Sequence, residues 1–252
     1  MNDEYGVYIP GAAAAEERTI DALSRAAELS RIDAQMLLAS PLPKRVRSES
    51  TSSDAAARVR LLREGGLDAF VVTHEALGRV KPVRAKSFRF DGGSLRLEPP
   101  EASFEPGALR LIVLGEILSS SRVDQSVSTP RRYGPPVVER VKGERHTSGE
   151  RFVHLYGESH ARVVEIRPQS FNFRALGTDF GPALSGNVAT FLERLRRVFP
   201  DVRSDDSLLR FPPMPDDLGK VGGTVEHEVH KEDNEAQTLR TSILIALDLL
   251  RR

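Results

Sequence analysis

The sequence predicts an α+β protein: a small β-α-α-β-α-β module followed by a mostly antiparallel β domain that an amphipathic helix closes. Short apolar runs alternate with amphipathic runs over residues 5–73. An Asp-Gly-Gly turn then separates two alternating runs within residues 87–98, and a strongly amphipathic run covers 188–199. Periods of two and 3.6 residues indicate strands and helices. We therefore expect domains at 1–78 and 84–200, followed by a C-terminal segment at 201–252.

The first half of the N-terminal module holds one strand and two helices. Residues 5–9 alternate and end at a Pro-Gly pair, as a short strand does. Residues 12–28 carry apolar residues at helical spacing. Ser30 is a suitable cap for a second helix, which Pro41 would end. Three apolar residues are expected to share one face of that helix: Ile32, Met36 and Leu37.

The second half of the module adds a strand, a helix and a last strand. Residues 44–48 predict a short polar strand. Ser53 is expected to cap a third helix, and Gly65-Gly66 supplies the left-handed conformation that commonly ends one. Residues 69–72 are apolar and predict a buried final strand.

This order of signals resembles the C-terminal domain of the ribosomal large-subunit stalk protein, and the adaptor of the Clp protease has a similar fold. Residues 32–38 look like the second helix of that family, 43–46 like its middle strand, and 53–69 like its third helix and the following turn. The factor-binding face of the family is lysine-rich, whereas residues 12–38 contain no lysine. The resemblance therefore implies a small protein-interaction module without translation-factor binding.

The central region begins with a hairpin. Asp91-Gly92-Gly93 separates two alternating runs within 87–98, and such a turn needs the positive φ that glycine adopts easily. Four side chains should face one side of this hairpin: Phe88, Phe90, Leu95 and Leu97. Residues 109–118 are almost continuously apolar and predict a strand in the centre of a sheet.

Residues 119–150 lose this periodicity and hold serines, prolines and charges of both signs. They predict a long exposed loop or ragged hairpin, a largely flexible insertion. Residues 151–157 and 161–166 predict two further strands, and Phe171 and Phe173 continue the alternation. Asn187 is expected to cap the amphipathic helix at 188–199.

The strands and closing helix of residues 84–200, with their opening hairpin, resemble the pleckstrin-homology-like domains of bacteria. In those domains an amphipathic helix plugs a curved antiparallel sheet. The resemblance carries over no functional residue. The alternative is that all strands join one continuous sheet with the N-terminal module.

The C-terminal segment divides into two parts. Residues 201–223 are rich in Pro, Asp and Gly, so we expect them to wrap the surface without regular structure. Asp233 or Asn234 would start a last helix. One side of this helix carries four apolar residues: Leu239, Ile243, Ala246 and Leu250.

The composition of the chain excludes several classes of function. Lys+Arg and Asp+Glu number 36 each, so no net charge attracts nucleic acid or an anionic membrane. The chain has no cysteine, which excludes disulfides, thiol catalysis and thiolate zinc sites. The acidic start shows no signal peptide, and the longest apolar run, 243–250, is too short to span a membrane. We expect a cytoplasmic protein with no membrane span.

One cluster has the residue types of a metal site. His227 and His230 stand among four acids: Glu226, Glu228, Glu232 and Asp233. Zinc proteases place their two histidines four residues apart on a helix, and here the spacing is three. We therefore expect a solvated linker and no metal, with a metal-dependent hydrolase as the alternative.

Two further groups of residues are candidates for chemistry. His154, Glu158 and His160 surround one predicted turn, where an acid–base pair is conceivable. His154 is expected at an exposed position of its strand. Residues 177–186 are glycine-rich and precede a helix start, a place where anions bind. Their spacing matches no phosphate-binding loop, so we expect an ordinary loop.

Basic residues gather in and next to the predicted insertion. An array of this kind can contact the phosphates of nucleic acid or of anionic lipid. Neighbouring acids partly cancel the charge, so we expect a disordered loop, with binding of nucleic acid or anionic lipid as the alternative. The residues are Arg131, Arg132, Arg140, Lys142, Arg145 and Arg151.

The sequence thus predicts no catalytic, cofactor-binding or metal-binding residue. We expect a non-catalytic binding or adaptor protein whose partner is another protein. A structural protein that oligomerises through its last helix is a further alternative. The central expectation is that the apolar residues hold two small sheets and their helices together, with no inward-facing set of reactive groups.

Overall fold

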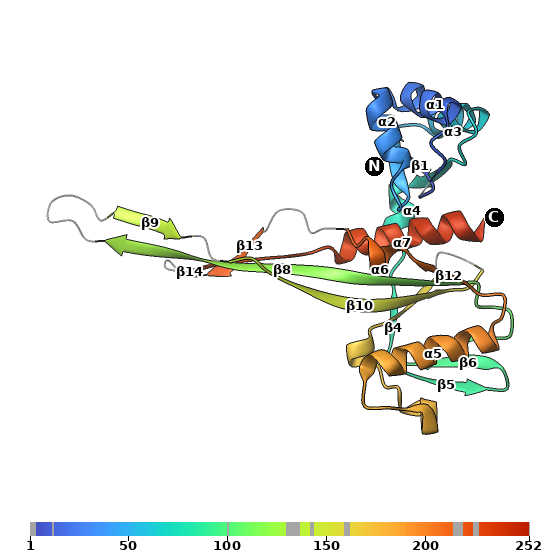
Figure 1. Cartoon of the computed structure of the whole chain (residues 1–252), viewed down its shortest axis with the longest axis vertical. Helices are drawn as coiled ribbons and strands as arrows, with labels where there is room; N and C mark the ends of the chain where they lie inside the picture. The colour runs from blue at the N-terminus through green and yellow to red at the C-terminus, as the bar shows by residue number, and fades with distance from the viewer. Residues whose placement is uncertain are drawn as a thin grey trace.

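The computed structural model describes residues 4–11, 13–99, 101–129, 137–141, 144–158, 162–213, 219–223 and 227–251. The protein has the predicted α+β class, with helices beside antiparallel sheets. The strands of the described residues form three separate sheets, so the alternative of one continuous sheet is wrong. Figure 1 shows the N-terminal module at one end of the molecule, a long central sheet, and a small sheet with a covering helix at the other end.

The N-terminal module has the predicted order of elements. Its sheet places β1 (Tyr5–Ile9) between β2 (Lys44–Glu49) and β3 (Phe70–Thr73), both antiparallel to β1. Its three helices are α1 (Glu17–Ala27), α2 (Arg31–Leu38) and α3 (Ser52–Glu64). Side chains of β1 and of the three helices form one apolar core on one face of this sheet.

Local capping signals explain three of the helix ends in this module. The Ser30 hydroxyl accepts a hydrogen bond from the Asp33 backbone N–H, as predicted for the start of α2. The predicted cap at Ser53 is wrong, because the Thr51 hydroxyl accepts the Asp54 N–H and α3 starts earlier. Gly66 has a φ of 88° just after α3, which confirms the left-handed end.

The predicted apolar face of α2 is wrong. Ile32 and Met36 are 71% and 70% exposed, whereas Ala34 and Leu38 are fully buried. The helix has only two turns, so a small rotation about its axis changes which residues meet the core.

The central sheet is built on two long antiparallel strands, β8 (Leu111–Thr129) and β10 (His146–Tyr156). Helix α7 (Glu235–Leu250) packs against β8. In Figure 1, β8 extends well beyond the helices. The other strands of this sheet are β4 (Val83–Ala85), β9 (Val137–Val141), β11 (Val163–Ile166), β12 (Arg203–Asp206), β13 (Gly219–Gly223) and β14 (His227–Asp233).

The segment at 119–150 differs from the predicted irregular loop. Its described residues at 119–129, 137–141 and 146–150 belong to strands, which agrees better with the hairpin alternative. The backbone of β8 pairs with β10 and β14, and these hydrogen bonds need no apolar side chains. A periodicity of side chains therefore could not have revealed them.

The C-terminal segment also has more structure than predicted. It contributes β12, β13 and β14 to the central sheet, and a short helix, α6 (Ser207–Arg210), follows β12. The predicted linker before the last helix is therefore β14. The last helix is confirmed, since α7 follows Asn234 directly.

The third sheet contains the predicted hairpin. It has the order β5 (Ser87–Asp91), β6 (Ser94–Glu98), β7 (Ala102–Phe104). Gly92 and Gly93 have φ values of 57° and 88°, as this two-residue turn requires. Helix α5 (Leu184–Val198) covers the sheet through Phe191, whose ring centroid lies 4.7 Å from that of Phe88.

One prediction near α5 is wrong, and another holds only for burial. Asn187 lies inside the helix instead of capping it, and its side-chain amide donates to the Gly181 carbonyl at 2.9 Å and accepts from the Gly181 N–H at 2.8 Å. Phe171 and Phe173 are buried with exposed Asn172 between them, as the predicted alternation requires, but they belong to no strand. They lie beside two 3-10 helices, η1 (Pro168–Ser170) and η2 (Arg174–Asp179), and pack into the same aromatic core.

The N-terminal module and the central sheet share a core. Phe70 and Val72 of β3 belong to the same apolar cluster as Phe152 of β10 and Ile243 of α7. Helix α4 (His74–Arg79) connects the two parts and also contacts α7. The C-terminal helix therefore fixes the module to the rest of the chain.

Among the helices that the structure describes, none combines the length and the apolar content that crossing a membrane requires.

Candidate functional site

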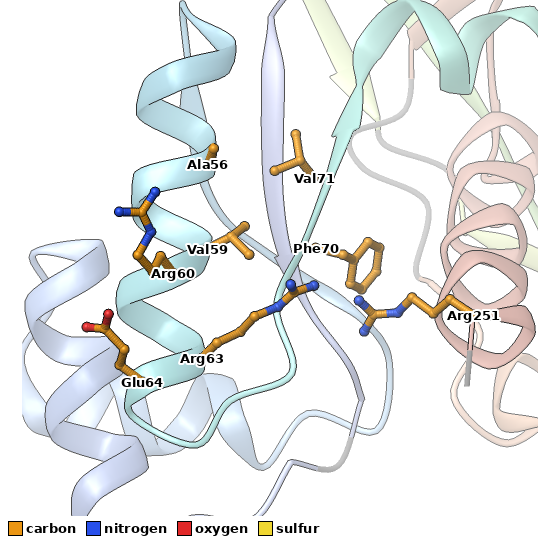
Figure 2. A pocket seen from close by; sticks show the side chains of 8 residues that line it. All are labelled: Ala56, Val59, Arg60, Arg63, Glu64, Phe70, Val71 and Arg251. Carbon is orange, nitrogen blue, oxygen red and sulfur yellow. The ribbon is translucent and has the colours of Figure 1, made fainter.

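A groove of about 770 Å³ lies at the outer edge of β3 and is the candidate binding site. Figure 2 shows Val59 and Arg63 extending from α3 toward β3. Phe70 of β3 points the other way, toward Arg251 at the end of α7. The groove therefore combines residues from the N-terminal module with one from the far end of the chain.

The edge of β3 has unpaired backbone groups. Within its sheet, β3 is hydrogen-bonded to β1 alone. The His74 N–H donates to the Glu4 carbonyl at 3.0 Å. Glu4 and His74 are therefore the first hydrogen-bonded pair of the β1–β3 ladder. The direction in which backbone groups form hydrogen bonds alternates along a strand. The backbone N–H and C=O groups of Val72 and Phe70 therefore also point toward β1. The N–H and C=O of Val71 consequently point away from β1, toward the groove.

The side chains beside this edge are apolar. Val71 is 37% exposed, a large fraction for a valine in a sheet. Phe70 is buried on the opposite face, where the Arg251 guanidinium lies 4.3 Å from its ring centroid. An extended chain along this edge would therefore meet Val71 on one face and the Arg251 guanidinium that covers Phe70 on the other.

Two guanidinium groups converge at the start of β3. Arg63 Nε donates to the Ala69 carbonyl at 3.0 Å, and Arg251 Nη1 lies 3.5 Å from the same oxygen. Arg251 also pairs with Asp68 at 2.9 Å and Asp248 at 2.8 Å. Within the described part of the chain, Arg60 and Arg63 have no carboxylate at ion-pair distance. The groove thus keeps positive charge that its own acids do not neutralise.

The opposite edge of the same sheet is different. Strand β2 carries Lys44, Arg45, Arg47 and Glu49, and charged side chains of this kind discourage pairing with another strand. Strand β3 has the sequence Phe-Val-Val-Thr and carries no charge. The sheet therefore has one protected edge and one that is open to a partner.

A second polar arrangement lies buried beneath α7. His154 of β10, Glu165 of β11 and Ser242 of α7 are 2%, 2% and 0% exposed. His154 Nδ1 lies 2.9 Å from Ser242 Oγ, and His154 Nε2 lies 3.2 Å from Glu165 Oε2. The Tyr156 hydroxyl completes the chain at 2.8 Å from Ser242 Oγ.

Ion pairs extend this cluster. Arg167 Nη2 donates to Glu165 Oε2 at 3.0 Å and to Glu235 Oε1 at 2.7 Å, and Arg167 Nη1 donates to Glu150 Oε2 at 2.9 Å. Arg84 of β4 bridges Glu165 and Glu235 as well. Glu235 belongs to the first turn of α7, so the pairs connect that helix to the sheet.

Burial and hydrogen bonding set the charges of this cluster. Burial lowers the pKa of His154, although its hydrogen bond to Glu165 acts in the other direction. Burial raises the pKa of Glu165, but hydrogen bonds from His154 and Arg167 outweigh this and bring the pKa to about 2. At neutral pH a neutral His154 therefore donates through Nε2 to ionised Glu165 and accepts the Ser242 hydroxyl at Nδ1.

The order serine, histidine, glutamate is that of a nucleophile, its base and the group that orients the base. Catalysis requires that a substrate carbonyl reach the serine oxygen. Ser242 has no exposed surface and lies on the sheet-facing side of α7. The cluster in this arrangement attaches α7 to β10 and β11 and offers no access to a substrate.

Two sequence predictions are wrong here. His154 is buried, not exposed, and ionisable groups do meet in the interior, where we expected none. The signal was present in residues 152–156, where a single histidine interrupts a run of apolar and aromatic residues. A strand buried on both faces has this pattern, so its histidine needs an internal partner.

The remaining acid–base candidates do not come together. Glu158 is exposed and pairs with Arg110 at 3.4 Å, whereas His154 contacts Glu165 and Ser242. His160 lies outside the described residues. In the glycine-rich loop at 177–186, the Asn187 amide occupies both backbone groups of Gly181, which gives this loop a structural explanation.

The predicted metal cluster falls on β14. His227 and His230 are three residues apart within this strand. Glu226 lies outside the described residues, and Glu228, Glu232 and Asp233 belong to the same strand. Where side chains are described, no three His, Asp or Glu residues lie close enough together to hold a metal ion.

The basic residues of the insertion are only partly described. Arg131, Arg132 and Lys142 lie outside the described residues, and Arg140 belongs to β9. Arg145 and Arg151 are exposed. Binding of nucleic acid or lipid here stays a prediction.

No protein-family model matches this chain, and neither does any curated protein or solved structure. The resemblances to the stalk protein and to pleckstrin-homology-like domains therefore stay predictions.

Proposed function

We propose that this chain is a cytoplasmic, non-catalytic binding protein that holds another protein at the β3 groove. The observation that carries the proposal is the open edge of β3, where Val71 and its outward-pointing backbone N–H and C=O lie beside Arg60 and Arg63, which have no acidic partner among the described residues. Proteins normally protect a sheet edge with charge, as β2 does here. Binding of a partner would explain why the edge of β3 is left without such charges.

The attachment of the module supports this role. Helix α7 shares a core with β3 and supplies Arg251 to the groove. A partner bound at the edge would therefore contact both the N-terminal module and the body of the protein. Such a contact fits an adaptor, which holds its partner in a fixed position relative to the rest of the chain.

The test is recovery of a partner followed by direct binding. The tagged chain is crosslinked in extracts of its native cell, and each recovered protein is purified and titrated against the unmodified chain. The double variant R60E/R63E should lose binding, because it reverses the charge of the groove. The control R196E changes an exposed arginine of α5, at the other end of the molecule, and should bind normally. A purified partner that binds all three proteins equally would contradict the proposal.

The alternative of a metal-dependent hydrolase at His227 and His230 has a separate test. We expect elemental analysis of the purified chain to find no stoichiometric metal. One zinc ion per chain, lost in the variant H227A/H230A, would favour the hydrolase instead.

A further inference from the structure

We propose that the β3 groove binds an extended acidic segment of its partner, which adds to the sheet as a fourth strand. This inference rests on the proposed function, because it names the kind of partner that the same groove accepts. It makes separate predictions about the backbone, the charge and the side-chain pattern of that segment.

The backbone of β3 is suited to strand addition. The N–H and C=O of Val71 point away from β1, as the His74–Glu4 hydrogen bond and the alternation of the ladder require. A chain laid along this edge can exchange two hydrogen bonds with Val71. Main-chain hydrogen bonds of this kind provide much of the affinity when a peptide extends a sheet.

The side chains around Val71 determine where the apolar residues of the segment belong. Neighbouring residues on paired strands point to the same face of a sheet. The residue opposite Val71 would therefore point to the α3 side, beside Val59 and Ala56. Val71 is exposed there, so an apolar residue at this position would cover it.

The arginines determine where the acidic residues belong. The position two residues along, opposite Ala69, points to the same face and meets Arg63, whose guanidinium has no carboxylate partner within the described residues. The segment residue between these two positions lies opposite Phe70. Its side chain points to the other face of the sheet, beside Arg251. Glu64 also lines the groove, but Figure 2 shows its carboxylate pointing away from β3.

Charge and backbone together favour a peptide over other anions. A nucleic acid or a lipid headgroup would satisfy the arginines, but it has no alternating N–H and C=O groups to pair with Val71. An acidic peptide satisfies both. The expected segment carries an apolar residue opposite Val71 and acidic residues opposite Phe70 and Ala69.

The first test measures affinity. A fluorescent, end-capped peptide with one valine between two pairs of glutamates is titrated against the full chain by anisotropy, with a counterpart in which lysines replace the glutamates. We expect binding of the glutamate peptide alone. R63Q, which removes the charge but keeps a hydrogen-bond donor, should weaken binding about tenfold, as expected for a lost charge-assisted hydrogen bond. R196E should bind as the unmodified chain does.

The second test examines the backbone without changing the protein. Two further peptides are N-methylated, each on one of the two alternating sets of peptide bonds. In a strand, one set donates toward β3 and the other faces away. We expect one methylated peptide to lose binding and the other to keep it. Equal affinities of the two peptides, or equal binding of the lysine peptide, would overturn strand addition by an acidic segment.

These outcomes separate the inference from the proposed function. In one outcome no peptide binds, but a purified partner protein binds the unmodified chain and does not bind R60E/R63E. The proposal of an extended acidic segment is then wrong, and the groove remains the binding site. If the partner protein is also insensitive to R60E/R63E, both proposals fail.

Discussion

The arginines of this protein occupy two contrasting environments. Beneath α7, Arg167 is 6% exposed and contacts three carboxylates, Glu150, Glu165 and Glu235. At the β3 edge, Arg60 and Arg63 are exposed, and the described residues place no carboxylate within ion-pair distance of them. The same side chain thus serves the fold in one place and remains available to a partner in the other.

The difference predicts where substitutions act. A buried charge that loses its partner strongly destabilises a protein, because its desolvation is no longer offset. An exposed arginine without a partner contributes little to stability. Changes beneath α7 should therefore affect unfolding, and changes at the β3 edge should affect binding.

The largest effect is expected from E165A. It removes the one buried carboxylate among the three that contact Arg167, which is 6% exposed, and it removes the partner of His154 Nε2. We expect a loss of about 3–5 kcal/mol in the free energy of unfolding, measured with urea. The control E98A removes an exposed carboxylate that pairs with Arg89 at 3.6 Å and should cost less than about 1 kcal/mol. Similar losses of unfolding free energy in E165A and E98A would contradict the proposed difference between buried and exposed ion pairs.

A smaller effect is expected from S242A. It removes the described partner of His154 Nδ1 and of the Tyr156 hydroxyl, both of which are buried. The expected loss is about 1–3 kcal/mol, the cost of unsatisfied buried polar groups. T241A, on the exposed side of the same helix, should change stability by less than about 0.5 kcal/mol. Equal effects of the two substitutions would show that the buried chain of hydrogen bonds contributes nothing.

The buried cluster should also make stability depend on pH. The pKa of His154 is lower in the folded protein than its ordinary 6.5, so the unfolded chain takes up a proton first. Stability should therefore fall as the pH drops below about 6.5. Glu165 has a pKa of about 2 in the folded protein against 4.5 ordinarily, so its contribution is complete above 4.5 and is lost as the pH falls toward 2.

Urea unfolding at about pH 7.5 and about pH 5.5 isolates the first of these steps. The variant H154Q cannot take up this proton, so its stability should change less between the two conditions. An unchanged pH dependence in H154Q would assign the step to another group.

The smallest effect on stability is expected at the groove. R60E should change the free energy of unfolding by no more than about 0.5 kcal/mol, because Arg60 is an exposed residue of α3. The affinity of the R60E variant for the acidic peptide should nevertheless fall, because the substitution reverses a charge beside the groove. A loss of stability comparable to that of E165A would mean that Arg60 serves the fold.

The local parts of this fold could be predicted from the sequence because short-range signals determine them. The Ser30 cap, the Gly66 helix end and the Asp91-Gly92-Gly93 turn each depend on a few adjacent residues. The first strand and the closing helix follow from side-chain periodicity. These elements are where the predictions hold.

The long-range parts could not be predicted in the same way. Polar strands such as residues 119–123 of β8 are held by backbone pairing with segments far away in the sequence. The His154–Ser242 contact joins residues 88 positions apart, and the β3 groove needs Arg251 from the last helix. No local pattern shows that these residues meet.

The most direct test of the account is hydrogen exchange at the Val71 amide, measured by NMR with and without the peptide that carries one valine between two pairs of glutamates. The account predicts fast exchange in the free protein, since this N–H points away from β1, and marked slowing when the peptide binds. The Val72 amide, already directed at β1, should change little. If the Val71 amide is protected in the free protein, or if saturating peptide leaves its exchange unchanged, the open edge of β3 is not a binding surface.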